Sequence, residues 1–536
     1  MSASSSSPAA SGSAAKAPKL LGFAVPLLGI LGALQGSAPN VSSTALVSLT
    51  KALGMEGGSV ALAASIQTIL IASSVITTGL LADRLGRRRV LMVALLVGAA
   101  GNAISGLAPV SVIYLLGQAI TGVGLGAVYG SAFGYIHSVA KPGKLAAALG
   151  LFGAVIGLAT MIFTFIGGAL IGVNWRLGFL SLAVFGVLFF FAVPLVLPPI
   201  ARLKGQSLDI LGQIILAIGI IGFLFGVSQL GRSLTALTTL GPLIGGAIVL
   251  AVFFVYESKV KGAFYPVALF RSPVFIAAIL AGFVYNFGTS VAFLQTTNLW
   301  QYVTNVPTNQ LAVWQVPLIA AGIVGALLTG RLMGRGMTNR TALLLGTIVT
   351  VVGFVMLALV AKEKSFWAFL PGLVIGGAGV VAVSIPFGNL FIKEAPPAQY
   401  GPVTSSRTTV GQFWYSIGFA LATVMVDKLT MGGVVAKLTA AGVQPDMIGT
   451  AVTSINQYVK SGTEPTTDAG RQALSAAVES YSGAFTTVML MSAALMLVGG
   501  VVAWFLLRRN AAHAEAVPGP PPATETSASA STTAKG

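Results

Sequence analysis

The chain has 536 residues, of which 55% are hydrophobic and only 8% are charged. Soluble domains carry about 25% charged residues, and hydrocarbon excludes charge strongly, so this composition excludes an ordinary soluble protein. The absence of cysteine excludes disulfides, thiolate metal sites and thiol nucleophiles. The net charge of +17 comes from short basic groups between apolar blocks, and we therefore expect no nucleic-acid partner.

Fourteen apolar blocks have the length of a membrane span, which needs about 20 apolar residues per helix. In chain order they cover residues 20–38, 58–81, 90–108, 112–136, 146–170, 177–198, 210–230, 240–256, 274–296, 312–334, 341–361, 366–390, 408–427 and 485–507. The strands of a membrane barrel would instead appear as segments of about 10 residues in which apolar and polar residues alternate. The sequence therefore predicts an all-α membrane protein with 14 transmembrane helices. One alternative is a cleaved first block, because Gly36-Ser37-Ala38 loosely resembles a signal-peptide cleavage site.

The loops carry an asymmetric charge that sets the orientation, because Lys and Arg accumulate in cytoplasmic loops. With the N-terminus inside, the short outer loops hold only Lys51, Arg176, Arg232, Lys362 and Lys364. The inner side collects most other basic residues, Arg407 among them. We predict a multi-pass protein of the cell (plasma) membrane with both termini in the cytoplasm.

The sharpest local pattern is Gly79-Leu-Leu-Ala-Asp83-Arg84-Leu-Gly86-Arg87-Arg88-Arg89, between the second and third blocks. Glycines allow helices to approach and the turn to reverse, and a carboxylate can accept from arginine or lie at a helix N-terminus. A merely basic inner turn would explain the arginines but not the acid and the glycines. The pattern predicts a conformational latch, formed by Gly79, Asp83, Arg84, Gly86, Arg87 and Arg88.

This run resembles the signature loop of the major facilitator superfamily, G-x-L-A-D-R-x-G-R-R/K, and Gly330-Arg-Leu-Met-Gly334-Arg335 is a weaker echo after the tenth block. The superfamily usually has twelve spans; two further spans between its halves are typical of its drug:proton antiporter branch. Trp175-Arg176 and Leu208-Asp209-Ile-Leu-Gly212 are similar to fragments of that branch.

The resemblance implies two six-helix bundles with two inserted spans. The expected parts are an N-tail at 1–19, a first bundle at 20–200, inserted spans at 205–258 and a second bundle at 272–509, followed by a C-tail at 510–536. The second bundle would contain an extracytoplasmic loop at 428–483. The tails are rich in Ser, Ala, Pro and Thr, and we expect both to be disordered.

Residues that the family uses for proton coupling and drug export are missing. Gln118 replaces the arginine of an R-x-x-x-G motif before Gly122, and the first block contains no acid. Within the spans that line the cavity in this family, the candidate substrate residues are Gln35, Gln118, Tyr129, Tyr285 and Asn286. Each could instead form an interhelical hydrogen bond. The candidate coupling acids are Asp83, Asp209 and Asp427.

The predicted function is secondary active transport of a small neutral or amphiphilic molecule, with export by alternating access. A neutral substrate is expected because no charged side chain lies deep inside any predicted span. Uptake or facilitated diffusion of a neutral metabolite remains the alternative. A channel or membrane enzyme is disfavoured because filter-like sequences, charge rings and deep catalytic groups are missing. We expect no enzyme activity, no metal and no cofactor apart from coupling protons. The expected partners are the substrate and membrane lipid, and we expect a monomer.

Overall fold

The computed structural model describes residues 21–514, except 56–57, 142–143, 201–208, 231–232, 305, 307, 397–398, 445–447, 449 and 451–466. Every regular element in these ranges is helical. The predicted N-tail (1–19) lies outside the described residues, as does residue 515 onward. Residues 510–514 of the predicted C-tail continue the last helix.

The first half of the chain folds as η1 (Leu21–Phe23), α1 (Ala24–Ala52), α2 (Gly58–Leu85), α3 (Arg87–Leu107), α4 (Ser111–Val139), α5 (Leu145–Val173) and α6 (Trp175–Val196). The predicted insert is the pair α7 (Ile210–Gln229) and α8 (Leu237–Lys259). The second half consists of η2 (Val267–Arg271), α9 (Pro273–Gly282), the π-helical turn η3 (Phe283–Phe287), α10 (Gly288–Tyr302), α11 (Thr308–Gly334), α12 (Asn339–Leu359), α13 (Phe366–Glu394), α14 (Tyr400–Ala440) and α16 (Asp468–Ala514).

Thirteen helical segments of the described chain are long and apolar enough to cross a membrane, with α9, η3 and α10 forming one of them. The prediction of an all-α membrane protein is confirmed. Helix α1 has 29 residues but is not among the thirteen. It contains Gln35, Ser37 and Asn40, which lower its hydropathy. The count of fourteen spans therefore stays a prediction.

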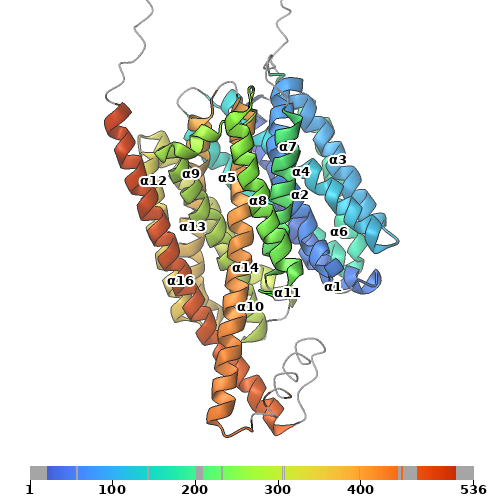
Figure 1. The fold of residues 1–536 in the computed structure, drawn as a ribbon, viewed down its shortest axis with the longest axis vertical. Helices are drawn as coiled ribbons and strands as arrows, with labels where there is room; N and C mark the ends of the chain where they lie inside the picture. Colours follow the sequence, from blue (N-terminus) through green and yellow to red (C-terminus); the bar gives the residue numbers. More distant parts are fainter. Residues whose placement is uncertain are drawn as a thin grey trace, which may run out of the picture.

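The helices form two bundles, with the inserted pair beside the seam between them (Figure 1). Helices α1–α6 pack on one another, as do α9–α14 and α16. Helices α7 and α8 pack tightly together, and α7 contacts both α2 and α14. The insert thus contacts both halves of the molecule.

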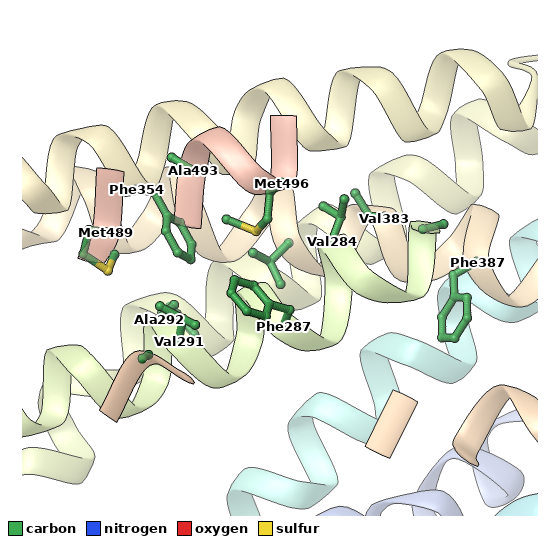
Figure 2. Packing of buried hydrophobic residues seen from close by; sticks show 14 of the residues in the cluster. Val284, Phe287, Val291, Ala292, Phe354, Val383, Phe387, Met489, Ala493 and Met496 are labelled. Carbon is green, nitrogen blue, oxygen red and sulfur yellow. The ribbon is translucent and has the colours of Figure 1, made fainter. Parts of the chain in front are cut away.

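The second bundle has a continuous apolar core. Figure 2 shows Val284, Phe287 and Val291 of the broken helix η3/α10 facing Met496 of α16 and Phe354 of α12. These side chains are at most 2% exposed. Phe387 of α13 lies at the edge of this group (Figure 2), where the second half meets the first. Burial of this kind fixes the helix positions from which the site is built.

Much of the segment 428–483, predicted as an extracytoplasmic loop, is helical. Helix α14 continues to Ala440, and α16 already begins at Asp468. A helix of 41 residues is about 60 Å long, twice the roughly 30 Å of a bilayer core. The two helices therefore project from the bundle as a hairpin (Figure 1), held by Val434, Leu438 and Ala473 and by a Lys437–Glu479 ion pair of 2.6 Å.

The number of spans can be tested by single cysteines, because the native chain has none. We expect Gly22→Cys and Arg335→Cys, both at exposed positions, to react with a membrane-impermeant maleimide only from the cytoplasm. The exposed position Ala441 at the hairpin, replaced by cysteine, should react only from outside. Opposite sidedness of positions 22 and 335 would show that α1 does not cross the membrane.

Candidate functional site

The turn between α2 and α3 defines one end of the bundle, called the motif end below. Helix α2 ends at Leu85 and α3 begins at Arg87, so Gly86 alone makes the turn, with φ +97°. Side chains rarely adopt this left-handed backbone, which explains the second glycine of the sequence motif. Arg88 anchors the turn by donating to the Pro194 carbonyl at 3.2 Å near the end of α6.

Asp83 connects the two halves of the molecule. Its side chain is 4% exposed and forms an ion pair with Arg87. Its second carboxylate oxygen accepts a hydrogen bond from the backbone N–H of Gly401, at the start of α14. The N-terminus of a helix carries partial positive charge, so one buried carboxylate compensates both Arg87 and α14. Arg87 also lies over the Tyr400 ring, 5.3 Å from its centre.

Glycines on both helices allow α2 and α14 to approach each other closely here. A Cβ atom added to Gly401 would lie 2.3 Å from both the Gly79 carbonyl oxygen and a carboxylate oxygen of Asp83. A Cβ added to Gly79 would lie 2.1 Å from the Ser405 hydroxyl. Gly134 of α4 similarly leaves room for the Arg87 guanidinium. The structure thus brings Gly79, Asp83 and Arg87 together against α14, whereas Gly86 and Arg88 shape the turn. The buried Nε of Arg84 has no hydrogen-bond partner among the described residues.

A second seam joins α5 to α11. A Cβ atom on Gly150 would lie 2.9 Å from the Ala326 carbonyl and 3.0 Å from Gly330. Gly150 is near the start of α5 and Gly330 near the end of α11, so this contact is also at the motif end. The α2/α14 seam continues inward to Thr409, which donates to the Ala72 carbonyl at 2.7 Å. The two halves are therefore closed against each other at the motif end.

The premise that no charged side chain lies deep inside a span is wrong, because Arg407 does. Helix α14 begins at Tyr400, so Arg407 lies two turns, or about 10 Å, inside it. Its side chain is 8% exposed. Pro402 was the available signal, since proline is tolerated in the first turn of a helix and marks a start near residue 400.

Arg407 crosses the seam to an aromatic group on the other half. It donates from Nη1 to the Tyr129 hydroxyl of α4 at 2.6 Å. Its guanidinium carbon lies 4.7 Å from the centre of the Phe133 ring and 4.5 Å from that of Phe387. Each aromatic face contributes roughly 0.5–2 kcal/mol, against about 2.5–3.5 kcal/mol for a charge at the centre of a membrane helix. The rings stabilise the cation without neutralising it.

Besides Tyr129, two further predicted cavity residues lie on the helix next to this site. Tyr285 and Asn286 occupy the π-helical turn η3, and both side chains are partly exposed despite their depth. The centre of the Tyr285 ring is 6.4 Å from that of Phe387, whose face lies over the Arg407 guanidinium. Single π-helical turns inside α-helices are frequent at functional sites. The cluster formed by Tyr129, Phe133, Tyr285, Asn286, Phe387 and Arg407 is called the central cluster below.

The other two predicted cavity residues lie within the first bundle. Gln35 on α1 is 9% exposed, and Gln118 on α4 is fully buried. Gln118 accepts from the Ser42 hydroxyl at 2.9 Å and donates to the Ser105 hydroxyl at 2.8 Å. These bonds join α1, α4 and α3, so the geometry gives Gln118 a packing role in this conformation.

Replacing Gln118 with leucine tests this role. We expect a loss of about 1–3 kcal/mol of stability, because the variant removes two buried hydrogen bonds between helices and leaves Ser42 only Gln67, and Ser105 only the Gly101 carbonyl of its own helix, as partners. The measurement is the thermal unfolding midpoint in detergent. The substrate concentration giving half-maximal transport should change less than about twofold, since no binding contact is lost. A large change in that concentration, with unchanged stability, would instead show that Gln118 contacts the substrate.

The candidate acids lie in three different places. Asp427 is exposed in the outer part of α14, twenty residues from Arg407. Asp209 caps α7, accepting from the Gly212 N–H at 3.1 Å and the Tyr256 hydroxyl at 2.9 Å. Beside it Glu257, which the sequence placed outside a span, is 2% exposed within α8.

Tyr265 connects Glu257 to the helix that carries Arg407 through two separate hydrogen bonds. Glu257 accepts from the Tyr265 N–H at 2.7 Å, and the Tyr265 hydroxyl bonds the Ser406 hydroxyl at 2.9 Å. A Cβ atom on Gly212 would touch both Asp209 and Glu257 carboxylates. The base of the insert is therefore an acidic pair connected to α14.

Comparison with known protein families matches residues 28–419 to the Major Facilitator Superfamily. The chain belongs to this superfamily. A multi-pass transporter architecture follows from this membership and from the thirteen apolar helices. The glycine-rich contact between α2 and α14 is thus the structural setting of the superfamily's signature loop.

Several curated superfamily members are similar in sequence. An uncharacterized MFS-type transporter of Mycobacterium tuberculosis is 25% identical over 81% of this chain and 62% of that protein, so the chain spans less than two thirds of this relative. The multidrug transporter protein MdtP of Bacillus subtilis is 26% identical over 66% of this chain and 64% of that protein. A multidrug resistance protein B homolog of M. tuberculosis is 24% identical over 84% and 83%. The superfamily member thus resembles proteins of its drug exporter branch.

Solved structures show the same fold. The human organic anion transporter MFSD10 aligns with a TM-score of 0.54, at 14% identity, over 89% of this chain and 98% of that chain. The proton:xylose symporter XylE aligns with a TM-score of 0.55, at 12% identity, over 88% and 94%. Likeness at this identity supports the fold alone.

Proposed function

We propose that this superfamily member is a secondary active exporter of small amphiphilic molecules, acting as a monomer in the plasma membrane with both termini in the cytoplasm. The observation that carries the proposal is the seam at the motif end. There the halves touch through glycines, one buried carboxylate and a strip of apolar side chains from α2 that includes Leu80, and among the described residues this contact contains no covalent or metal link that would prevent its separation. Alternating access needs such a separable contact on each side of a central site.

The relatives named as multidrug transporters support export. The central cluster supports an amphiphilic substrate, because it combines four aromatic rings with polar groups on the seam. The closed motif end corresponds to one of the two states that alternating access requires. We further propose that protons drive the cycle through the acidic pair Asp209–Glu257, in which the buried Glu257 is connected to α14 through Tyr265 and Ser406.

The direction is tested in cells that lack their own efflux pumps. Cells expressing the chain should accumulate less of an amphiphilic fluorescent dye than cells expressing an inactive variant, and a protonophore should abolish the difference. Higher dye accumulation in the expressing cells would instead favour the alternative, uptake. An unchanged difference after protonophore treatment would contradict proton coupling while leaving export in place.

A further inference from the structure

The central cluster contains a cation without a counter-ion. The described part of the chain contains three ion pairs, namely Asp83–Arg87, Lys437–Glu479 and Asp468–Arg471, and none involves Arg407. Burial removes water from this guanidinium, and a buried charge is normally paired. The charge of Arg407 is therefore uncompensated by the described side chains.

The described side chains leave the Nε of this guanidinium without a hydrogen-bond partner. Its five N–H donors lie in one plane, whereas Phe133 and Phe387 lie over its faces. Nη1 donates to Tyr129, but the buried Nε has no partner. Gly388 lies beside Nε, and a Cβ atom there would already be 3.4 Å from it. The edge that can form paired hydrogen bonds with an oxyanion therefore carries an unpartnered, buried Nε beside a residue without a side chain.

The surroundings match an aromatic or amphiphilic anion. The polar groups of the central cluster are the Tyr129 hydroxyl, which accepts from the guanidinium, the Tyr285 hydroxyl and the Asn286 amide. All three are uncharged hydrogen-bonding groups, and none can neutralise the guanidinium. A carboxylate or similar oxyanion would supply the missing charge, while its apolar body could contact the rings of Phe387 and Tyr285.

We infer that the transported molecule carries an anionic group, of the carboxylate type, which binds the guanidinium of Arg407. The inference deepens the proposed export function and rests on it. An arriving anion competes with Tyr129 for Arg407, so binding weakens a hydrogen bond that crosses the seam between the halves. Substrate occupancy is thereby linked to the release of the closed state.

The test uses three dansyl compounds that share one fluorophore and differ in charge. Dansylglycine carries a carboxylate, dansylglycinamide is neutral, and dansyl-ethylenediamine carries an ammonium group. Dissociation constants are measured by fluorescence titration with the purified full chain. We expect the carboxylate to bind about tenfold more tightly than the amide, as for a charge-assisted hydrogen bond, and the amine to bind weakest.

Variants separate binding from a structural role. Arg407→Gln should abolish the preference for the carboxylate, and Arg407→Lys should keep part of it. Tyr129→Phe removes the cross-seam hydrogen bond but leaves the cation, so it should retain or increase the preference. If Arg407 had only a structural role, the Tyr129 and Arg407 variants would lose the preference equally. Arg340→Gln is the matched control, because Arg340 also stacks on an aromatic ring, Trp504 at 3.8 Å, at a site outside the seam.

The wild-type titration alone can overturn the inference, whatever the variants' folding. Failure of the carboxylate to bind, or equal binding of the amide or the amine, would refute an anion site. An unchanged carboxylate preference in Arg407→Gln would do the same. Dye export from cells is measured independently, so a transporter that exports cations or neutral dyes would keep the proposed function and lose only this inference.

Discussion

Asp83→Asn is expected to lower the transport rate at least about tenfold at equal membrane abundance. Asparagine keeps the shape of the side chain but removes the charge that compensates both Arg87 and the N-terminus of α14. Breaking a buried ion pair by removing one partner costs roughly 3–5 kcal/mol, and a tenfold change corresponds to about 1.4 kcal/mol. The measurement is initial dye efflux, normalised to the amount of folded protein in the membrane.

Asp468→Asn is the matched control. Asp468 also pairs with an arginine on its own helix, Arg471, but its side chain is 88% exposed, and exposed pairs contribute little. Its transport rate should equal that of the wild type. A wild-type rate in Asp83→Asn as well would show that the buried pair does not act as a latch.

Gly401→Ala should separate α2 from α14 and shift the protein away from the closed state. The added methyl group would lie 2.3 Å from two atoms of the opposite helix, so the helices must move apart. We expect transport to fall by about tenfold or more, because one state of the cycle loses its contact. The individual helices should stay folded, since this glycine lies in the first turn of α14 where it faces α2.

A cysteine at Ser405 reports the separation directly. Ser405 is fully buried beside Gly79, so Ser405→Cys should react slowly with N-ethylmaleimide in the otherwise cysteine-free chain. Adding Gly401→Ala should accelerate the reaction. Gly432→Ala on the same helix has no atom within 4 Å of the added methyl group and should change neither labelling nor transport. Slow labelling in Gly401→Ala would contradict the opening of the seam.

Much of the fold could be predicted from the sequence, because apolar block length and the signature loop report directly on membrane crossing and on family. The partner of Asp83 could not be predicted. Gly401 is 318 residues away along the chain, and no local pattern links them. The amide of Gln118 could not be distinguished from a cavity residue, because a buried glutamine has the same sequence appearance in both roles.

Two differences between the sequence-based expectation and the structure have one physical cause. The apolar blocks and the helices begin and end at different residues. Apolar character begins after Arg407, but the helix begins at Tyr400, which hid a buried cation. Apolar character also ends near Asp427, but the helix continues to Ala440, which turned part of a hairpin into a predicted loop. A helix can extend wherever its backbone hydrogen bonds are satisfied. Hydropathy identifies only the part of the helix that contacts lipid, so it misses the ends.

Helix α14 has a practical consequence for observing the protein at work. It is one unbroken rod about 60 Å long that runs from the Asp83 contact at Gly401 to the projecting hairpin. When this helix tilts slightly about its middle, its two ends move together in opposite directions. A fluorophore at Ala441 would therefore signal the opening of the distant seam, and an antibody fragment gripping the hairpin would arrest the cycle from across the membrane, without entering the central cluster.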